Sequence, residues 1–369
     1  MENNAIDNAI MRDNFTGSFT SLKIRYKDLD DYLTSSQNYE MNDKVNVFLN
    51  FESIMKHITM ILNLQEKIMV QKEFEKIIVS NTINYIAHYK RFFVNNTFDT
   101  RVYLYMTDLD SDNFHERNYN EDFRSYYLMK YNSNPKFTLL ANKLRHDIIK
   151  EVKTLCDFIP NAYFIVSKNI DSSLVPLIVG NESKDRKNVI ISSDPYEMQY
   201  TFIDGYDDYY IKRNPTEIRT ISGKEGFINV YNKTEVNTCD LTRFYDTYPL
   251  FCSLLSSYGD KKRSIDNLSG VGIVSLSKLI ESGVSSNVIQ KSSSTPEVLG
   301  DIFHDTDLKD EFINNFYCTS FLNMYKELTQ ADKSSITNQI IDRRDDNAFV
   351  TLNRTTFANY PLIIEGLLI

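Results

Sequence analysis

The sequence predicts an α/β fold, a parallel sheet flanked by helices and followed by a helical region. Short runs of consecutive apolar residues alternate with longer segments whose apolar residues recur at helical spacing. Strands that are apolar without alternation are buried on both faces, as in parallel sheets covered by helices on each side. A Gly-x-Gly sequence near residue 270, between two apolar patterns of helical spacing, places further helices after the sheet.

The composition indicates a globular protein with a substantial core. The chain has 369 residues, 42% of them hydrophobic, and a formal net charge of −9. This acidic balance argues against a general DNA-coating protein, because DNA affinity depends on neutralising phosphates, and it limits DNA contact to local basic patches. No apolar run approaches the ~18 residues of a membrane span, and the N-terminus has no signal-peptide core. We therefore expect no membrane partner and a cytoplasmic protein.

The cysteines support the same compartment. They are widely spaced, show no zinc-binding pattern and are expected to be reduced and buried. They are Cys156, Cys239, Cys252 and Cys318.

The elements follow in order along the chain. Strands are predicted at 45–49, 101–106, 162–166 and 187–194. Helices are predicted at 52–93, 139–158, 173–179, 197–202 and over most of 297–345, and a hairpin or excursion at 204–235. Residues 1–44 are polar and are expected to extend the first domain, which covers 45–255, while 256–369 form the helical region.

Polar residues follow three of the predicted strands. Asn50 comes at the end of the first, Asp108 follows the second and Asp194 ends the fourth. The carboxyl ends of parallel strands meet at one edge of a sheet, where functional groups are usually placed. We expect these three side chains to lie within one site.

The segment from Ile265 to Ile280 is the most informative motif. Ile265 and Leu268 are spaced as on one helical turn, Gly270, Val271 and Gly272 follow, and a second apolar helical pattern comes next. This arrangement predicts a helix-hairpin-helix. Its glycines allow a phosphate to approach bare backbone N–H groups at a helix start, which holds a nucleic-acid backbone without reading its sequence. Basic residues flank the turn at Lys261, Lys262 and Lys278.

Together these motifs resemble the 5′-nuclease, or flap endonuclease, family, whose bacteriophage members are the most similar. The resemblance spans about residues 45–369 and implies a PIN-like fold for the nuclease domain. It also implies two divalent metal ions held by a ring of carboxylates, since Mg²⁺ and Mn²⁺ prefer oxygen ligands and a metal pair stabilises the attacking and leaving oxygens.

The carboxylate ring is incomplete in this chain. The positions that match family acids and remain acidic are Asp108, Asp171, Asp194, Asp260 and Asp266. The positions at which the resemblance implies an acid and another residue stands are Asn50, Asn169, Ser172 and Tyr196. The loss of charge predicts at most one weakly bound Mg²⁺ or Mn²⁺, unless Asp110, Glu182 or Glu197 compensates.

The segment from Arg117 to Arg145 occupies the place of the family's helical arch. Cations such as Arg124 and Lys130 alternate with aromatic residues, a pattern that can grip a single strand or simply pack as a lid.

These features favour a noncatalytic, flap-endonuclease-like DNA-binding or scaffold subunit of a phage complex. Duplex or branched DNA is the expected partner, together with phage replication, transcription or virion proteins. Two alternatives remain: an active metal-dependent 5′–3′ exonuclease or flap endonuclease, and a structural subunit of a viral assembly without DNA contact.

Overall fold

A computed structural model gives the fold of this chain. It describes residues 44–64, 75–83, 85–86, 99–107, 145–159, 161–168, 170–214, 217–223, 244, 246–259, 265–283 and 296–341. Several predicted site residues and the N-terminal extension before Lys44 lie outside these residues. The site residues are Asp108, Arg124, Lys130, Asn169, Asp260, Lys261 and Lys262.

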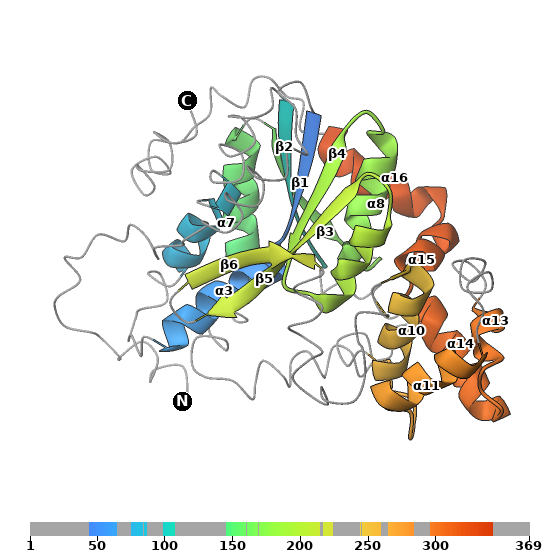
Figure 1. Cartoon of the computed structure of the whole chain (residues 1–369). Helices are drawn as coiled ribbons and strands as arrows, with labels where there is room; N and C mark the ends of the chain where they lie inside the picture. Colours follow the sequence, from blue (N-terminus) through green and yellow to red (C-terminus); the bar gives the residue numbers. More distant parts are fainter. Residues whose placement is uncertain are drawn as a thin grey trace, which may run out of the picture.

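A six-stranded sheet forms the centre of the molecule (Figure 1). Its strands are β1 (Lys44–Asn50), β2 (Asp99–Thr107), β3 (Ala162–Ser167), β4 (Lys187–Ser192), β5 (Tyr206–Asn214) and β6 (Glu217–Ser222). Their spatial order is β3-β2-β1-β4-β5-β6, and every neighbouring pair is parallel except β5 with β6. The predicted α/β class with a parallel sheet is confirmed.

Helices α3 (Phe51–Leu64) and α7 (Arg145–Phe158) cover one face of the sheet. Val47 and Leu49 of β1 point to this face and belong to one apolar cluster with Phe51 and Ile54 of α3 and Val152 of α7. Alternate strand residues face opposite sides of a sheet, so these side chains need a helical layer to cover them.

The opposite face carries the C-terminal helices as well as the crossover after β3. The elements on this side are η2 (Ser172–Leu174), α8 (Val175–Glu182), η3 (Pro195–Phe202), α10 (Tyr248–Tyr258), α11 (Ile273–Gly283), α13 (Glu297–Gly300), α14 (Thr306–Thr319), α15 (Phe321–Glu327) and α16 (Gln330–Ile341). One apolar cluster runs from Phe48 of β1 through Leu254 of α10 to Phe316 of α14. The predicted division between residues 255 and 256 falls inside α10 and stays a prediction.

The hairpin predicted within 204–235 is present as β5 and β6, which pair antiparallel, and β5 also joins β4 as a fifth parallel strand. Two other expectations need correction. The predicted helix through Ile265 and Leu268 is wrong, because residues 265–272 contain no helix. Cys318 is exposed and not buried, since it lies on the outer side of α14, whereas Cys156 and Cys252 are buried as expected.

The long helix predicted at 52–93 is described only in part. Helical residues occupy 51–64, 75–83 and 85–86. In the part of the chain that the structure describes, no helix is long and apolar enough to cross a membrane.

A buried polar group joins the sheet layer to the C-terminal helices. The amide of Gln199 in η3 donates to the carbonyl of Thr319 at 2.9 Å and accepts from the hydroxyl of Tyr248 at 2.9 Å and the N–H of Phe321 at 3.1 Å. Gln199 is fully buried, so each of these bonds replaces one with water that folding removes. Gln199 therefore helps to fix the orientation of α10 and α15 against η3.

We expect Gln199→Met to lower the free energy of unfolding by about 2–4 kcal/mol, because it leaves a buried N–H and a buried carbonyl without their partner. Urea denaturation measures the change. Gln330→Met, at an exposed position of α16, is the matched control and should change stability by less than about 0.5 kcal/mol. Equal effects of the two substitutions would contradict this account of Gln199.

Candidate functional site

The carboxyl edge of the sheet begins with Asn50, the last residue of β1. Its Oδ1 accepts from the backbone N–H of Ser53 at 3.0 Å, so the side chain caps the first turn of α3. Its Nδ2 donates to Oε1 of Glu197 at 2.9 Å. The two bonds fix which end of the amide faces which partner, and the oxygen that could bind a cation is turned toward the helix.

Glu197 of η3 reaches the same point from the other side of the sheet. Its second oxygen accepts from the hydroxyl of Tyr105 in β2 at 2.6 Å, and the residue is fully buried. Burial, the charge of Glu197 and this hydrogen bond raise the pKa of Tyr105 well above its ordinary value. Tyr105 therefore stays a proton donor, and the buried carboxylate is held by donors from β1 and β2.

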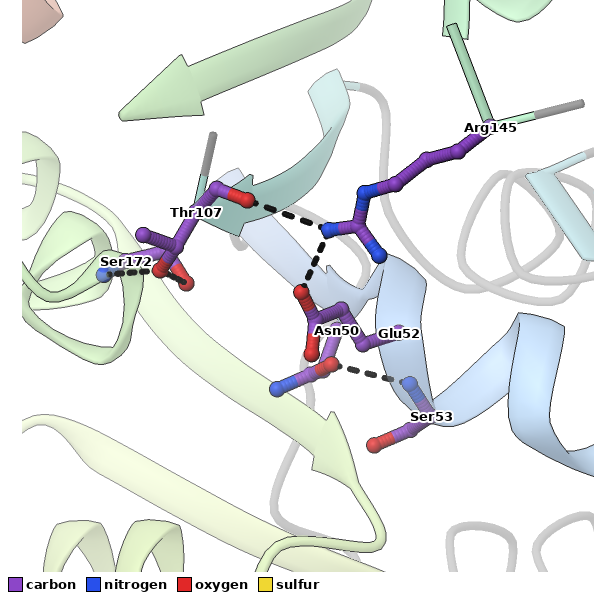
Figure 2. A network of polar contacts seen from close by, with 6 residues as sticks. All are labelled: Asn50, Glu52, Ser53, Thr107, Arg145 and Ser172. Atoms are coloured by element: carbon purple, nitrogen blue, oxygen red, sulfur yellow. Dashed lines mark hydrogen bonds and ion pairs between the residues drawn. The ribbon is translucent and has the colours of Figure 1, made fainter. Parts of the chain in front are cut away.

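A second charged group lies at the ends of β2 and α7. Figure 2 shows the guanidinium of Arg145 between Glu52 and Thr107. Its Nη2 donates to Oε1 of Glu52 at 2.8 Å and to the carbonyl of Thr107 at 3.2 Å. Both side chains of the ion pair are largely buried, 11% and 12% exposed. A guanidinium thus provides positive charge at this edge, where the family resemblance implies a metal ion.

The segment after β3, which contains Asp171 and Ser172, makes local hydrogen bonds. Asp171 is buried and its Oδ1 accepts from the N–H of Ser173 at 2.8 Å, capping η2. Ser172 meets Thr107, whose hydroxyl donates to the Ser172 hydroxyl at 2.9 Å and accepts from its N–H at 3.2 Å. This pair, visible in Figure 2, ties the end of β2 to the segment after β3.

Asp194 lies two residues beyond β4, next to the end of β1, because Leu49 pairs with Ile191. Its Oδ1 accepts from the N–H of Tyr196 at 3.0 Å and caps η3. Tyr196 replaces an acid that the resemblance implies. Its ring is buried in the cluster with the C-terminal helices, and its hydroxyl donates to the carbonyl of Leu255 in α10 at 3.3 Å. The side chain contributes to packing and not to a carboxylate ring.

The described residues do not fit a two-metal site. No group of three or more His, Cys, Asp or Glu side chains among them could hold a metal ion. Asp108 and Asp260 lie outside the described residues, so their part in a ring stays a prediction. Of the possible compensating acids, Glu197 is bonded to Asn50 and Tyr105, and Glu182 ends α8, which runs from the carboxyl edge to the opposite edge of the sheet.

The hairpin turn, residues 268–272, lies between α10 and α11. Gly270 has a positive φ of 73° and open space around its α-carbon, and Gly270 and Gly272 are exposed. Val271 is half-buried, Lys278 and Asp266 are exposed, and Leu268 is buried. The turn thus presents its backbone to the surroundings, as the sequence predicts, although an irregular segment and not a helix precedes it.

Sequence reasoning did not foresee the partners of Glu197 and Arg145. Tyr105 and Glu52 carry no motif, and the contacts join residues 92 and 93 positions apart. Arg145 was expected to belong to a cationic and aromatic segment, but its guanidinium binds Glu52. Glu52, an acid in the first turn of α3, was the available signal for a charged group at this edge.

Comparisons with known proteins find relatives only among solved structures. No protein-family model and no curated protein matches the chain. The 5′-exonuclease of bacteriophage T5 with bound zinc aligns with 13% identity and a TM-score of 0.47, over 80% of this chain and 98% of that chain. The flap endonuclease of bacteriophage T5 in a pseudo-enzyme-product complex with DNA and metal ions aligns with 13% identity and a TM-score of 0.45, over 88% and 100%. At this level, residue roles do not transfer from those proteins to this chain.

We expect Arg145→Met to lower the free energy of unfolding by about 3 kcal/mol, because it removes the guanidinium that pairs with the largely buried carboxylate of Glu52. The double variant Glu52→Leu with Arg145→Met should recover to within about 1 kcal/mol of wild type, since both charges of the pair are then removed together. Urea denaturation of the full cycle measures both. Lys44→Met, which breaks an exposed ion pair with Asp185, is the control and should have no measurable effect. A double variant as unstable as the single one would refute the pairing.

Proposed function

We propose that this chain is a noncatalytic DNA-binding subunit of a phage complex, with a fold like that of the 5′-nucleases and an eroded metal site. The observation that carries the proposal is the side chain of Asn50. Its oxygen caps α3 and its NH₂ group binds Glu197, so a cation at this position would have to displace both bonds. A buried carboxylate that accepts from an amide and a phenol needs no metal to balance it.

The charges around Asn50 also disfavour a bound divalent cation. Arg145 lies at the end of β2 beside Glu52, and its positive charge disfavours a divalent cation nearby. Asp171 and Asp194 each have an oxygen occupied by a cap, and Tyr196 is packed under α10. With fewer charges and a fixed guanidinium, the edge supports at most one weakly held Mg²⁺ or Mn²⁺ through Asp108, Asp171 and Asp194.

DNA contact is proposed at the hairpin turn. The exposed backbone around Gly270 and Gly272 precedes α11, whose first N–H groups have no intrahelical acceptor and carry partial positive charge. Lys278 is exposed on the same helix, and Lys261, Lys262 and Arg263 stand nearby in the sequence. Such a surface holds a phosphate backbone of any sequence, which an acidic protein can do only at a local basic patch.

We expect the wild-type protein not to cleave flap or duplex DNA with Mg²⁺ or Mn²⁺, because its edge lacks the charge for two metal ions. A nuclease assay on labelled flap DNA, together with calorimetry of Mn²⁺ binding, measures this. The matched control is Asp194→Asn, which keeps an oxygen to cap η3 and removes the charge. Two tight cation sites, or cleavage that disappears in Asp194→Asn, would establish the alternative of an active 5′-nuclease.

We expect Gly272→Glu to weaken binding of duplex and flap DNA by about tenfold or more, because it places an anion where a phosphate would lie. Affinity should also fall steeply with salt for the wild type. Asn181→Glu adds the same charge at an exposed position near the C-terminal end of α8 and is the control. If the wild type has no DNA affinity at low salt, the chain is better explained as a structural subunit of a viral assembly.

A further inference from the structure

The C-terminal end of α10 is the point at which the hairpin turn is attached to the rest of the protein. The last carbonyls of a helix have no partner within the helix and must find others. Here the carbonyl of Leu255 accepts from the N–H of Gly259 at 3.0 Å and from the Tyr196 hydroxyl at 3.3 Å. The carbonyl of Ser257 accepts from the N–H of Leu268 at 3.0 Å, so the returning segment is bonded directly to the helix end.

Gly259 allows the returning segment to come this close. Its φ is 63°, and a Cβ added there would lie 2.5 Å from the carbonyl carbon of Asp266 and 2.6 Å from the nitrogen of Asn267, and closer still to the carbonyl oxygen of Ile265. Backbone atoms cannot yield to such a contact. The segment that begins at Ile265 therefore packs directly against the end of α10.

Asn315 of α14 holds the two sides of this point together. Its Nδ2 donates to the carbonyl of Ser256 in α10 at 3.0 Å and to the carbonyl of Asp266 in the returning segment at 2.9 Å. One amide NH₂ group thus donates both of its hydrogens, one to a carbonyl of α10 and one to a carbonyl of the returning segment. The side chain is half-buried, whereas its neighbour Asn314 is exposed.

We propose that Asn315 is a positioning residue for DNA binding by the hairpin turn, a role that rests on the proposed function. It touches no phosphate itself. It fixes the returning segment on α10, so that the backbone of Gly270 to Gly272 faces the DNA in one arrangement. A preorganised surface binds more tightly because the ordering cost is met during folding.

Asn315→Asp tests the role with little change in shape. A carboxylate cannot donate to either carbonyl, and Asn314→Asp adds the same charge at the adjacent exposed position. We expect Asn315→Asp to bind duplex DNA about tenfold more weakly than Asn314→Asp, the size expected for two lost hydrogen bonds. The slope of log affinity against log salt should also become shallower by about one phosphate contact, or about 0.9. A purely structural role would leave this slope unchanged.

Hydrogen–deuterium exchange gives a readout that does not depend on DNA. In Asn315→Asp, exchange should become faster at residues 265–272, while strands β1, β2 and β4 keep their protection. If Asn315→Asp does not fold, Asn315→Ser, which keeps one donor, should show intermediate changes in affinity and exchange. When wild type binds DNA and Asn315→Asp matches Asn314→Asp in affinity and slope, the positioning role alone is overturned. When wild type does not bind DNA at all, the proposed function fails, and this role with it.

Discussion

The hydrogen-bonded contact of Asn50 and Tyr105 with Glu197 organises the site. A buried carboxylate is costly unless several donors hold it, and here β1 and β2 each supply one. Because Glu197 belongs to η3, the contact fixes that segment over the carboxyl ends of the strands. Tyr196 and Gln199 then point from η3 toward the C-terminal helices and hold α10 and α15 in place. The sheet edge and the helical region are thus positioned by the same short segment.

Hydrogen bonds and one ion pair stabilise the polar groups at this edge of the sheet. Strand ends bring backbone carbonyls and polar side chains together, and some positive charge is needed where acids remain. Arg145 supplies it from α7, bonded to Glu52 and to the carbonyl of Thr107. Caps occupy an oxygen of Asp171 and of Asp194, and hydroxyl groups link the neighbouring loops. Local hydrogen bonds therefore hold the described polar side chains at this edge in place.

The exposed backbone of the hairpin turn is positioned by buried contacts at the end of α10. Gly270 and Gly272 are exposed, but their position follows from the bonds at the end of α10 and from the missing side chain of Gly259. Leu268 anchors the turn in the apolar cluster with Leu276 of α11. The irregular segment is therefore bonded to two helices, through the N–H of Leu268 to α10 and the carbonyl of Asp266 to α14.

The sequence by itself determined the fold class, most strand positions and the place of Asn50 and Asp194 at one edge. Short apolar runs without alternation are typical of strands covered on both faces, and parallel strands bring their carboxyl ends together. It also indicated the exposed glycine turn. It wrongly assigned a helix to Ile265 and Leu268, because two buried residues three positions apart fit a helix and an irregular segment equally well. Only the tertiary structure decided that Asn50 binds Glu197, that Arg145 pairs with Glu52 and that β5 joins the sheet. These outcomes join residues far apart in the chain, and local sequence patterns carry no information about such partners.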